Sequence, residues 1–341
     1  MEEFLMSLFV PEAIYIDPAV EKYPEAFAIK KNISKLGVPT FNSKIVRIEK
    51  KSPLENYIAA KSTVLLTVNK EKELQSCHPS SDFQFSLSSS CPGNCQYCYL
   101  QTSQGKNPVI KLFVNVYEIM ALVNKYVENN LPKQTVFECA SLTDPVSLEH
   151  LTGNLTKVIE YFSTLEKARL RIVTKFHNVE PFLNLDHKEH TKFRFSINTK
   201  YVIHNFESKT PPLKERLVAA RTIATAGYPI GFILAPIMIY PNWKEEYSEL
   251  LTKVREAFDF YKGPISFELI QHRFTKTAKN LILQRFPQTK LDLDEENRQL
   301  KWGAFGQFKH IYKKDSSTEI KEFLTQKITQ LFSNGSIEYF T

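Results

Sequence analysis

The sequence predicts an α/β fold: a partial barrel of six parallel strands, (β/α)6, with a small α/β lobe before it and an extension after it. From residue 83 onward, apolar segments typical of strands alternate with longer segments typical of helices. Such alternation indicates βα units and a parallel sheet. Six strands are too few to close an eight-stranded barrel, so an open barrel is expected. The expected strands are 83–87, 135–140, 170–175, 193–198, 230–236 and 265–270.

The lobe that comes first is expected to occupy residues 1–75. Residues 13–16 and 62–68 have the composition of strands. A helix is expected between them, from Pro24 to Leu36, because Gly37 provides a stop signal. The barrel is then expected over residues 76–275 and the extension over residues 276–341. The barrel helices are expected at 115–129, 150–167, 213–226 and 243–261.

Three of the five cysteines, Cys91, Cys95 and Cys98, lie within eight residues. Thiolates are soft ligands, so such a cluster indicates a metal or iron–sulfur site. A structural zinc site takes four ligands, commonly as two separated pairs, whereas C-x3-C-x2-C supplies three from one loop. Three thiolates on a cubane of four irons leave one iron open to bind and reduce a ligand. The spacing therefore favours a [4Fe–4S] cluster over zinc or inert thiols.

Composition excludes several other classes. The odd cysteine count and the acidic N-terminus, 1–5, argue against a secreted disulfide framework. The longest apolar run, 231–240, contains Pro236 and is too short to span a bilayer. Glycine is scarce, and neither G-x-G-x-x-G nor a Walker loop occurs. The net charge of +7 permits an anionic partner without requiring one. We expect a soluble cytoplasmic protein that does not contact membranes.

Polar residues follow the predicted strands where the strand bodies are apolar. In barrels of this kind, chemistry gathers at these strand ends. They comprise Ser141 to Asp144, Lys175, Ser196, Asn198, Gln271 and His272. The sequence therefore predicts a site at this edge of the sheet, next to the cysteine loop.

The last segment, after residue 270, interleaves Lys and Arg with aromatic residues. This composition suits contact with nucleic acid, through cations for phosphates and aromatic rings for bases. A solvated helical face over a small core would look similar, so both interpretations stay open. Residues 301–306 place two glycines around an apolar pair, which predicts a tight hairpin with Phe305 at its tip.

Two cysteines lie outside the loop. Cys77 falls in the polar stretch 70–81 and is expected to be a free thiol on the solvent side. Cys139 lies two residues before Ser141, and residues i and i+2 of a strand face the same side. Cys139 could therefore point into the same cavity as Ser141, one layer deeper. The alternative is a small buried hydrophobe in the core.

The cysteine triplet followed by an aromatic residue is the signature of radical S-adenosylmethionine enzymes. Further strings resemble the spore photoproduct lyase family, and the resemblance extends from Phe9 to Thr341. These strings are Cys95 to Thr102, Arg194 to Asn198, Phe267 to Lys276 and Lys301 to Gly303. The resemblance implies a partial barrel and direct repair of a methylene-bridged thymine dimer in DNA. It also implies a [4Fe–4S] cluster, S-adenosylmethionine, and an electron donor such as flavodoxin or ferredoxin.

Roles for individual residues follow from the same resemblance. Lys175 and Ser196 would bind the carboxylate and ribose of S-adenosylmethionine, with Asn198 nearby. Thr143 and Asp144 occupy the place where most such enzymes carry a motif for the methionine amine. The remaining candidates are Tyr97 and Tyr99, which lie beside the cluster. The resemblance implies that these tyrosines carry the radical that forms during the reaction.

The sequence departs from the family at the hydrogen donor. The family carries a cysteine three residues before the aspartate, whereas this chain has Ser141, whose O–H bond is much stronger than a thiol S–H bond. Ala304 and Phe305 also replace what resembles an Arg-Tyr pair in the hairpin. The leading hypothesis is a lyase that reverses the dimer, with Cys139 or the tyrosines completing the reaction. Alternatives are a radical enzyme of the same family with another substrate, and a non-catalytic lesion-binding homologue.

Overall fold

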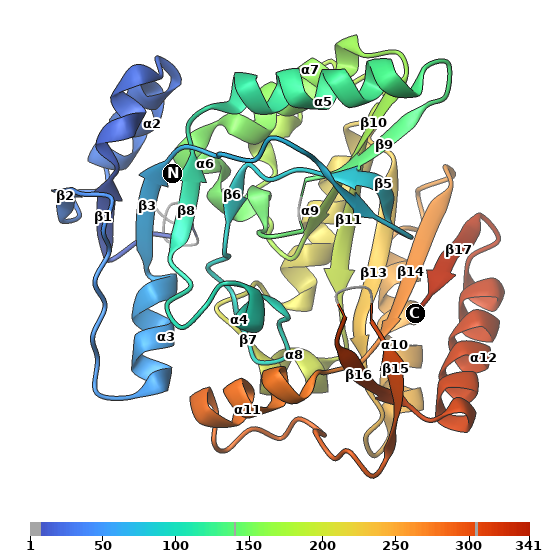
Figure 1. Cartoon of the computed structure of the whole chain (residues 1–341). Coiled ribbons are helices and arrows are strands. Elements are labelled where there is room, and N and C mark those ends of the chain that lie inside the picture. The colour runs from blue at the N-terminus through green and yellow to red at the C-terminus, as the bar shows by residue number, and fades with distance from the viewer. Residues whose placement is uncertain (1–7, 140, 304–305) are drawn as a thin grey trace.

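A sheet of eight strands forms the centre of the molecule in the computed structural model, which describes residues 8–139, 141–303 and 306–341 (Figure 1). The six predicted parallel strands are confirmed and are neighbours in this sheet. They are β5 (Ser81–Gln84), β9 (Thr135–Glu138), β10 (Ala168–Thr174), β11 (Thr191–Ile197), β13 (Ile230–Ile237) and β14 (Ile265–Gln271). β4 (Gln75–Cys77) pairs antiparallel with β5 at one edge, and β17 (Gly335–Phe340) pairs parallel with β14 at the other. The sheet therefore stays open.

Helices pack against the sheet between these strands, as the βα pattern predicts (Figure 1). They are α5 (Val116–Asn130), α7 (Asn154–Thr164), α9 (Leu213–Thr225) and α10 (Trp243–Ala257). α12 (Lys314–Leu331) packs against β17 and α10. The side chains of β10 alternate between buried and half-buried, and Phe137, Phe193 and Phe232 of neighbouring strands lie fully buried in the core.

The predicted helix 150–167 is interrupted. The structure has a short helix, α6 (Glu149–Thr152), followed by α7. Gly153 separates them with φ of 61°, a left-handed conformation that glycine adopts without steric cost. The Glu149 carboxylate accepts the backbone N–H groups of Leu155 (2.8 Å) and Thr156 (2.9 Å) and so caps α7.

A second sheet, of five strands, forms beside the first. Its order is β2 (Thr40–Asn42), β1 (Ala13–Ile16), β3 (Thr63–Thr67), β8 (Ile110–Phe113) and β6 (Ser88–Ser89). The two predicted strands and the predicted helix are confirmed, the helix as α2 (Glu25–Ser34). The structure adds α3 (Pro53–Lys61), which begins at a Ser52–Glu55 capping box. β6 and β8 come from beyond residue 75, so this sheet extends past the predicted boundary, and the division into domains stays a prediction.

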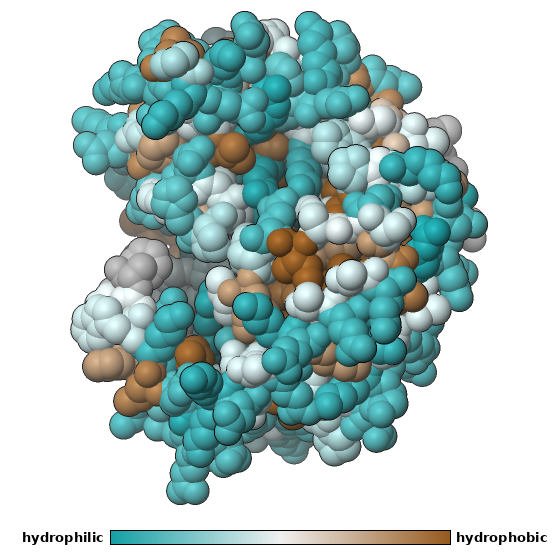
Figure 2. All heavy atoms as spheres, turned by 90° about the vertical axis from the view of Figure 1, so that its right-hand side faces the viewer, coloured by the Kyte–Doolittle hydropathy of each residue, from teal (hydrophilic) through white to brown (hydrophobic). Residues whose placement is uncertain are grey.

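The C-terminal segment begins with α11 (Lys276–Arg285) and continues as an antiparallel hairpin of β15 (Arg298–Trp302) and β16 (Phe308–Tyr312). The predicted hairpin is therefore confirmed, whereas Ala304 and Phe305 lie outside the described residues. Figure 2 shows the side of the molecule that lies on the right in Figure 1, where hydrophilic residues dominate and hydrophobic ones gather in a central group. Within the described residues, no helix has the length and apolar composition needed to cross a membrane.

Candidate active site

The cysteine loop follows β6. Backbone hydrogen bonds hold it in place, both within the loop and to a neighbouring strand. β7 (Asn94–Cys95) pairs antiparallel with β12 (Glu207–Ser208). The backbone N–H of Gly93 donates a hydrogen bond to Sγ of Cys91 (3.4 Å). A Cβ atom at Gly93 would lie 2.8 Å from Cγ2 of Thr210, so only glycine fits without displacing that side chain.

The loop is also supported from the C-terminal extension. α4 (Leu100–Ser103) follows the third cysteine, and Nε2 of Gln101 donates to the carbonyl of Cys95 (3.2 Å). Nη1 of Arg285, on α11, donates to the carbonyl of Gln101 (3.1 Å), and Nη2 donates to that of Gly105 (3.1 Å). The guanidinium also lies over the ring of Tyr57, 4.6 Å from its centroid. Three segments far apart in the sequence thus meet around the loop.

Burial favours the neutral form of two of the loop thiols. It raises the pKa of Cys91 to about 11, although the buried Lys61 ammonium acts in the opposite direction. It raises the pKa of Cys95 to about 12, against the effect of Lys175. A cationic group is therefore needed to hold these thiols as thiolates.

The donor set fits a cluster better than a single ion. In the part of the chain that the structure describes, no three His, Cys, Asp or Glu side chains converge around one metal position. A cubane does not need such convergence, because each thiolate binds a different iron. Cys91, Cys95 and Cys98 lie in one loop and none of the chain's five cysteines forms a disulfide. Three soft donors from one loop fit a [4Fe–4S] cluster.

Lys175 and Ser196 are brought together as predicted. Lys175 directly follows β10, and Ser196 is the next-to-last residue of the adjacent β11. Nζ of Lys175 donates to Oγ of Ser196 (3.0 Å). The same ammonium lies 4.0 Å from the Glu207 carboxylate, which accepts a hydrogen bond from the hydroxyl of Tyr97. Arg216 pairs with Glu207 from the other side (2.5 Å). Tyr97 thus links the cysteine loop to the strand ends.

The buried Glu207 carboxylate stays ionised in this setting. Burial raises the pKa of Glu207, but Lys175 and Arg216 outweigh that effect and hold the pKa below its ordinary value. One negative charge therefore faces two positive charges, which leaves a net positive environment beside Ser196. Such an environment suits the carboxylate of a bound ligand.

Asp144 is anchored to the end of β10. Its two carboxylate oxygens accept the Thr174 hydroxyl (2.8 Å) and the Lys175 backbone N–H (2.8 Å). Burial is the largest influence on Asp144 and raises its pKa to about 6, although these hydrogen bonds act in the opposite direction. A carboxylate has lone pairs beyond these two bonds, so it can still accept from an amine. Thr143 beside it accepts a hydrogen bond from Ser88 (3.1 Å).

Asn198 lies at the end of β11, where its amide is occupied by the protein. Nδ2 donates to the carbonyl of Pro236 (2.9 Å), and Oδ1 accepts from the Tyr247 hydroxyl (3.0 Å) and the Thr199 N–H (2.9 Å). Asn198 is fully buried. These contacts join the ends of β11 and β13, so they position the strand ends on which Ser196 lies.

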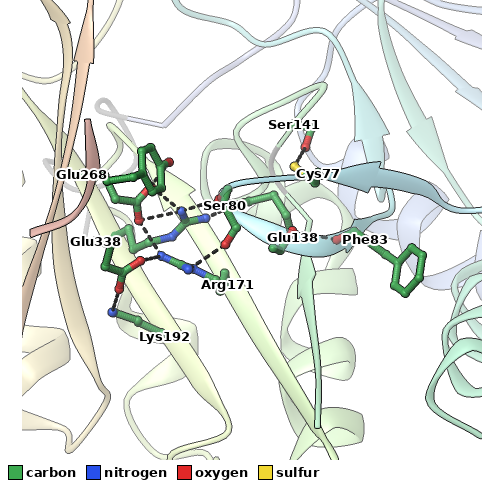
Figure 3. Close-up of polar contacts among 12 residues, drawn as sticks. Cys77, Ser80, Phe83, Glu138, Ser141, Arg171, Lys192, Glu268 and Glu338 are labelled. Atoms are coloured by element: carbon green, nitrogen blue, oxygen red, sulfur yellow. Dashed lines mark hydrogen bonds and ion pairs between the residues drawn. The ribbon is translucent and has the colours of Figure 1, made fainter. Parts of the chain in front are cut away.

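The structure corrects the expectation for Cys77. The thiol is half-buried at the end of β4, and its Sγ lies 3.7 Å from Oγ of Ser141 (Figure 3). The backbone carbonyl of Ser141 accepts a hydrogen bond from the hydroxyl of Tyr99. Sequence reasoning treated the segment around Cys77 as polar and expected its thiol on the solvent side. The contact arises because β4 pairs with β5 and β5 pairs with β9, which brings Cys77 close to the residues that follow β9. The sequence does not show this order of strands.

Cys139 is fully buried within the main hydrophobic core. The predicted strand ends earlier than expected, since β9 stops at Glu138, and Cys139 lies beyond it. The argument that alternate strand residues face one side therefore does not apply to Cys139 and Ser141. Its role as a hydrogen donor stays a prediction.

A buried ion network lies inside the sheet, and sequence reasoning missed it (Figure 3). Nη1 of Arg194 contacts Oε1 of Glu268 at 2.8 Å, and Nη2 pairs with Glu138. Arg171 pairs with Glu268 (2.6 Å) and with Glu338 of β17. The signal available was the presence of charged residues inside otherwise apolar strands, since buried charges are rare unless they are paired.

Comparison with known proteins gives a consistent result. A family profile described as spore photoproduct lyase matches residues 9–341. Spore photoproduct lyase of Bacillus subtilis (strain 168) is 43% identical over 338 residues, covering 98% of this chain and 99% of that protein. Spore photoproduct lyase of Geobacillus sp. (strain Y412MC61) is 39% identical over 343 residues, covering 98% and 100%.

Solved structures give the same match at the level of the fold. A spore photoproduct lyase complexed with dinucleoside spore photoproduct superposes with a TM-score of 0.95 at 38% identity, covering 98% of this chain and 99% of that one. A double mutant of spore photoproduct lyase with bound AdoMet and the same dinucleoside has the same TM-score, identity and coverage. The chain therefore belongs to the spore photoproduct lyase family.

Proposed function

We propose that this chain is a radical S-adenosylmethionine lyase that cleaves the carbon–carbon bridge of a methylene-linked thymine dimer and restores two thymines. One observation carries the proposal. The three-cysteine loop contacts the strand ends at two places. The hydroxyl of Tyr97 donates to Glu207, which forms an ion pair with Lys175 beside Ser196. The hydroxyl of Tyr99 donates to the carbonyl of Ser141. A relative at 38% identity binds a dinucleoside spore photoproduct.

Cys91, Cys95 and Cys98 would hold a [4Fe–4S] cluster, and S-adenosylmethionine would lie beside it. When bound, these groups supply a 5′-deoxyadenosyl radical, which takes a hydrogen atom from the lesion. Flavodoxin or ferredoxin would provide the electron. The Gly93 N–H and the buried Lys61 favour thiolate at Cys91, because both interact better with a charged sulfur than with a neutral one.

The strand ends would bind the cofactor. The Lys175 ammonium and the Ser196 hydroxyl would contact its carboxylate and ribose, since Glu207 is already neutralised by Arg216. Asp144 would accept from the amine, with its orientation fixed by Thr174. Tyr97 is held by Glu207 and closes this region against the loop. These contacts orient the cofactor while the lesion lies toward Tyr99 and Ser141.

DNA would contact the C-terminal extension. Leu300, Trp302 and Phe308 are exposed on the hairpin, and Trp302 and Phe308 pack edge to face with centroids 4.8 Å apart. Exposed aromatic rings near cationic side chains suit stacking on bases and contact with phosphates. This DNA would carry a thymine dimer photoproduct, the lesion that forms in the DNA of spores.

The test is an anaerobic assay with reconstituted, reduced protein, S-adenosylmethionine and dinucleoside spore photoproduct. Both 5′-deoxyadenosine and thymine are expected from the wild-type chain, and neither from Cys95→Ala. Formation of 5′-deoxyadenosine without thymine would contradict the substrate and favour another radical reaction. Tight binding of the lesion without cleavage of S-adenosylmethionine would instead favour a lesion-binding protein.

A further inference from the structure

We propose that Lys61 is the charge partner of the iron–sulfur cluster, and that its buried ammonium makes the cluster easier to reduce. This inference rests on the proposed function, because it concerns the cluster that Cys91, Cys95 and Cys98 would hold. It assigns a role in electron uptake to the end of α3, which supplies no cluster ligand and lies outside the strand ends of the parallel sheet.

Lys61 is buried without an anionic side chain beside it. It is the last residue of α3 and is only 3% exposed. Among the described residues, its Nζ has one hydrogen-bond partner, the hydroxyl of Tyr57 at 3.4 Å, and the centroid of the same ring lies 5.2 Å away. Burial raises the pKa of Tyr57 to about 12, so its hydroxyl is uncharged at neutral pH. Tyr57 therefore solvates the ammonium but does not balance its charge.

Most of the buried lysine and arginine side chains in the described structure pair with a carboxylate. They are Arg194 with Glu138 and Glu268, Arg216 with Glu207, and Arg298 with Asp292. Within the same residues, Lys61 and Arg285 have only neutral partners. Burying an ion is costly unless it is paired, and the carboxyl end of α3 offsets only a small part of this cost. The fold therefore leaves a positive charge unbalanced at this place.

The unbalanced ammonium lies close to the cysteine loop. Burial acts to lower the pKa of Lys61, but Tyr57 and the thiols of Cys91, Cys98 and Cys95 outweigh it and hold the pKa above its ordinary value. The effect is mutual, since Lys61 is the strongest of the influences that lower the pKa of Cys91. Because Tyr57 is uncharged, the loop thiolates are the anions that balance Lys61.

Packing fixes the ammonium relative to the loop. The guanidinium of Arg285 lies over the ring of Tyr57, 4.6 Å from its centroid, and donates to the carbonyls of Gln101 and Gly105 just after the loop. α11 thereby contacts both α3 and α4 (Figure 1). Tyr57 is fully enclosed, at 1% exposure. Lys61 is therefore held at a constant position beside the cysteines, where solvent does not replace it.

A fixed positive charge at this position favours the reduced cluster. One electron passes from the flavodoxin- or ferredoxin-type donor to the cluster, the donor is oxidised by one electron, and no proton needs to move. The cluster and its thiolates then carry one more negative charge, which the ammonium attracts. Burial keeps dissolved ions from screening this attraction. Lys61 therefore raises the reduction potential, since net charge and burial are among the properties that set it.

A redox titration of the holoenzyme, followed by electron paramagnetic resonance of the reduced cluster, tests the role of the charge. Lys61→Met keeps a long side chain but removes the ammonium. At a fixed solution potential its ratio of reduced to oxidised cluster should fall roughly tenfold, which is a midpoint potential about 59 mV more negative. Lys61→Arg keeps the charge and should titrate close to the wild type. Lys106→Met removes an exposed lysine that follows the same loop and is the matched control, with no expected shift.

The outcomes separate charge from packing and from the proposed function. If Lys61→Met does not hold the cluster, Lys61→Gln provides the same neutral comparison and should show the same fall. The shift should persist at high salt, because the charge is buried. A wild-type midpoint potential in the neutral variants, or an equal fall in Lys61→Arg, would overturn the role of the ammonium and leave the proposed function intact. A wild-type chain that binds no [4Fe–4S] cluster would instead overturn the proposed function.

Discussion

Nη1 of Arg285 lies 3.1 Å from the carbonyl oxygen of Gln101, although the two residues are 184 positions apart in the sequence. Through this contact α11 holds α4, the helix that follows the cysteine loop. The extension is therefore part of the support for the loop, in addition to any role in binding DNA.

Arg285→Ala should loosen the cysteine loop. The carbonyls of Gln101 and Gly105 would lose a buried charged donor, which costs about 1–3 kcal/mol of unfolding free energy. We expect lower iron and sulfide content per chain after reconstitution. Arg47→Ala is the control, since Arg47 is exposed and should have no effect. Full cluster content in Arg285→Ala would contradict this support role.

Lys175→Met should weaken the binding of S-adenosylmethionine. The variant keeps a long side chain but removes the ammonium next to Ser196, so the dissociation constant should rise roughly tenfold or more. Isothermal titration calorimetry of the holoenzyme measures it. Lys167→Met, just before the other end of β10, is the control and should bind normally. Unchanged affinity in Lys175→Met would mean that the ammonium serves only Glu207.

Arg194→Leu should be among the most destabilising substitutions in the protein. It removes the central cation of the buried network and leaves Glu138 and Glu268 without it, at a cost of about 3–5 kcal/mol. Urea unfolding followed by circular dichroism measures the loss. Lys253→Ala breaks only the exposed pair with Glu249 and should cost less than about 1 kcal/mol. Similar losses in both variants would refute the importance of the network.

Glu338 should make stability depend on pH in acid. Burial raises its pKa, but Lys192 and Arg171 outweigh this and lower it to about 2, below the ordinary value of 4.5. The folded state then binds fewer protons than the unfolded state between these values, so stability is present above about pH 4.5 and is lost as pH falls toward 2. Between pH 6 and pH 3 the wild type should lose about 2 kcal/mol more than Glu338→Gln.

Urea unfolding at the two pH values tests this difference. Glu180→Gln removes an exposed carboxylate and serves as the control, which should follow the wild type. If Glu338→Gln showed the same acid dependence as the wild type, the ion pairs with Lys192 and Arg171 would contribute nothing to stability.

Trp302→Ala should weaken binding of DNA without impairing cofactor cleavage. Its ring is 62% exposed on β15, so it is free to stack on a base. Loss of one stacking platform costs about 1–3 kcal/mol, or roughly tenfold or more in affinity. Fluorescence anisotropy with a labelled oligonucleotide measures it. Leu131→Ala removes another exposed apolar side chain, next to α5, and should bind normally. Equal affinity in both variants would argue for the solvated-face interpretation of the extension.

The parallel strands and the cysteine loop can be predicted from the sequence. Apolar runs that alternate with helices are typical of βα units, so the runs 135–140 and 193–198 are recognisable in the sequence as the strands β9 and β11. The close spacing of Cys91, Cys95 and Cys98 limits the chemistry available to the loop. Both signals are local in the chain, and neither depends on where distant segments fold.

The contacts between distant segments depend on how the whole chain folds. Cys77 looked like a solvent-side thiol because its neighbours are polar, yet the pairing of β4 with β5 brings it against Ser141, 64 residues away. Arg194 and Glu268 meet because their strands flank β13 in one sheet. Local composition reports whether a residue prefers water, whereas its partner is set by strand order and register, which are properties of the whole chain.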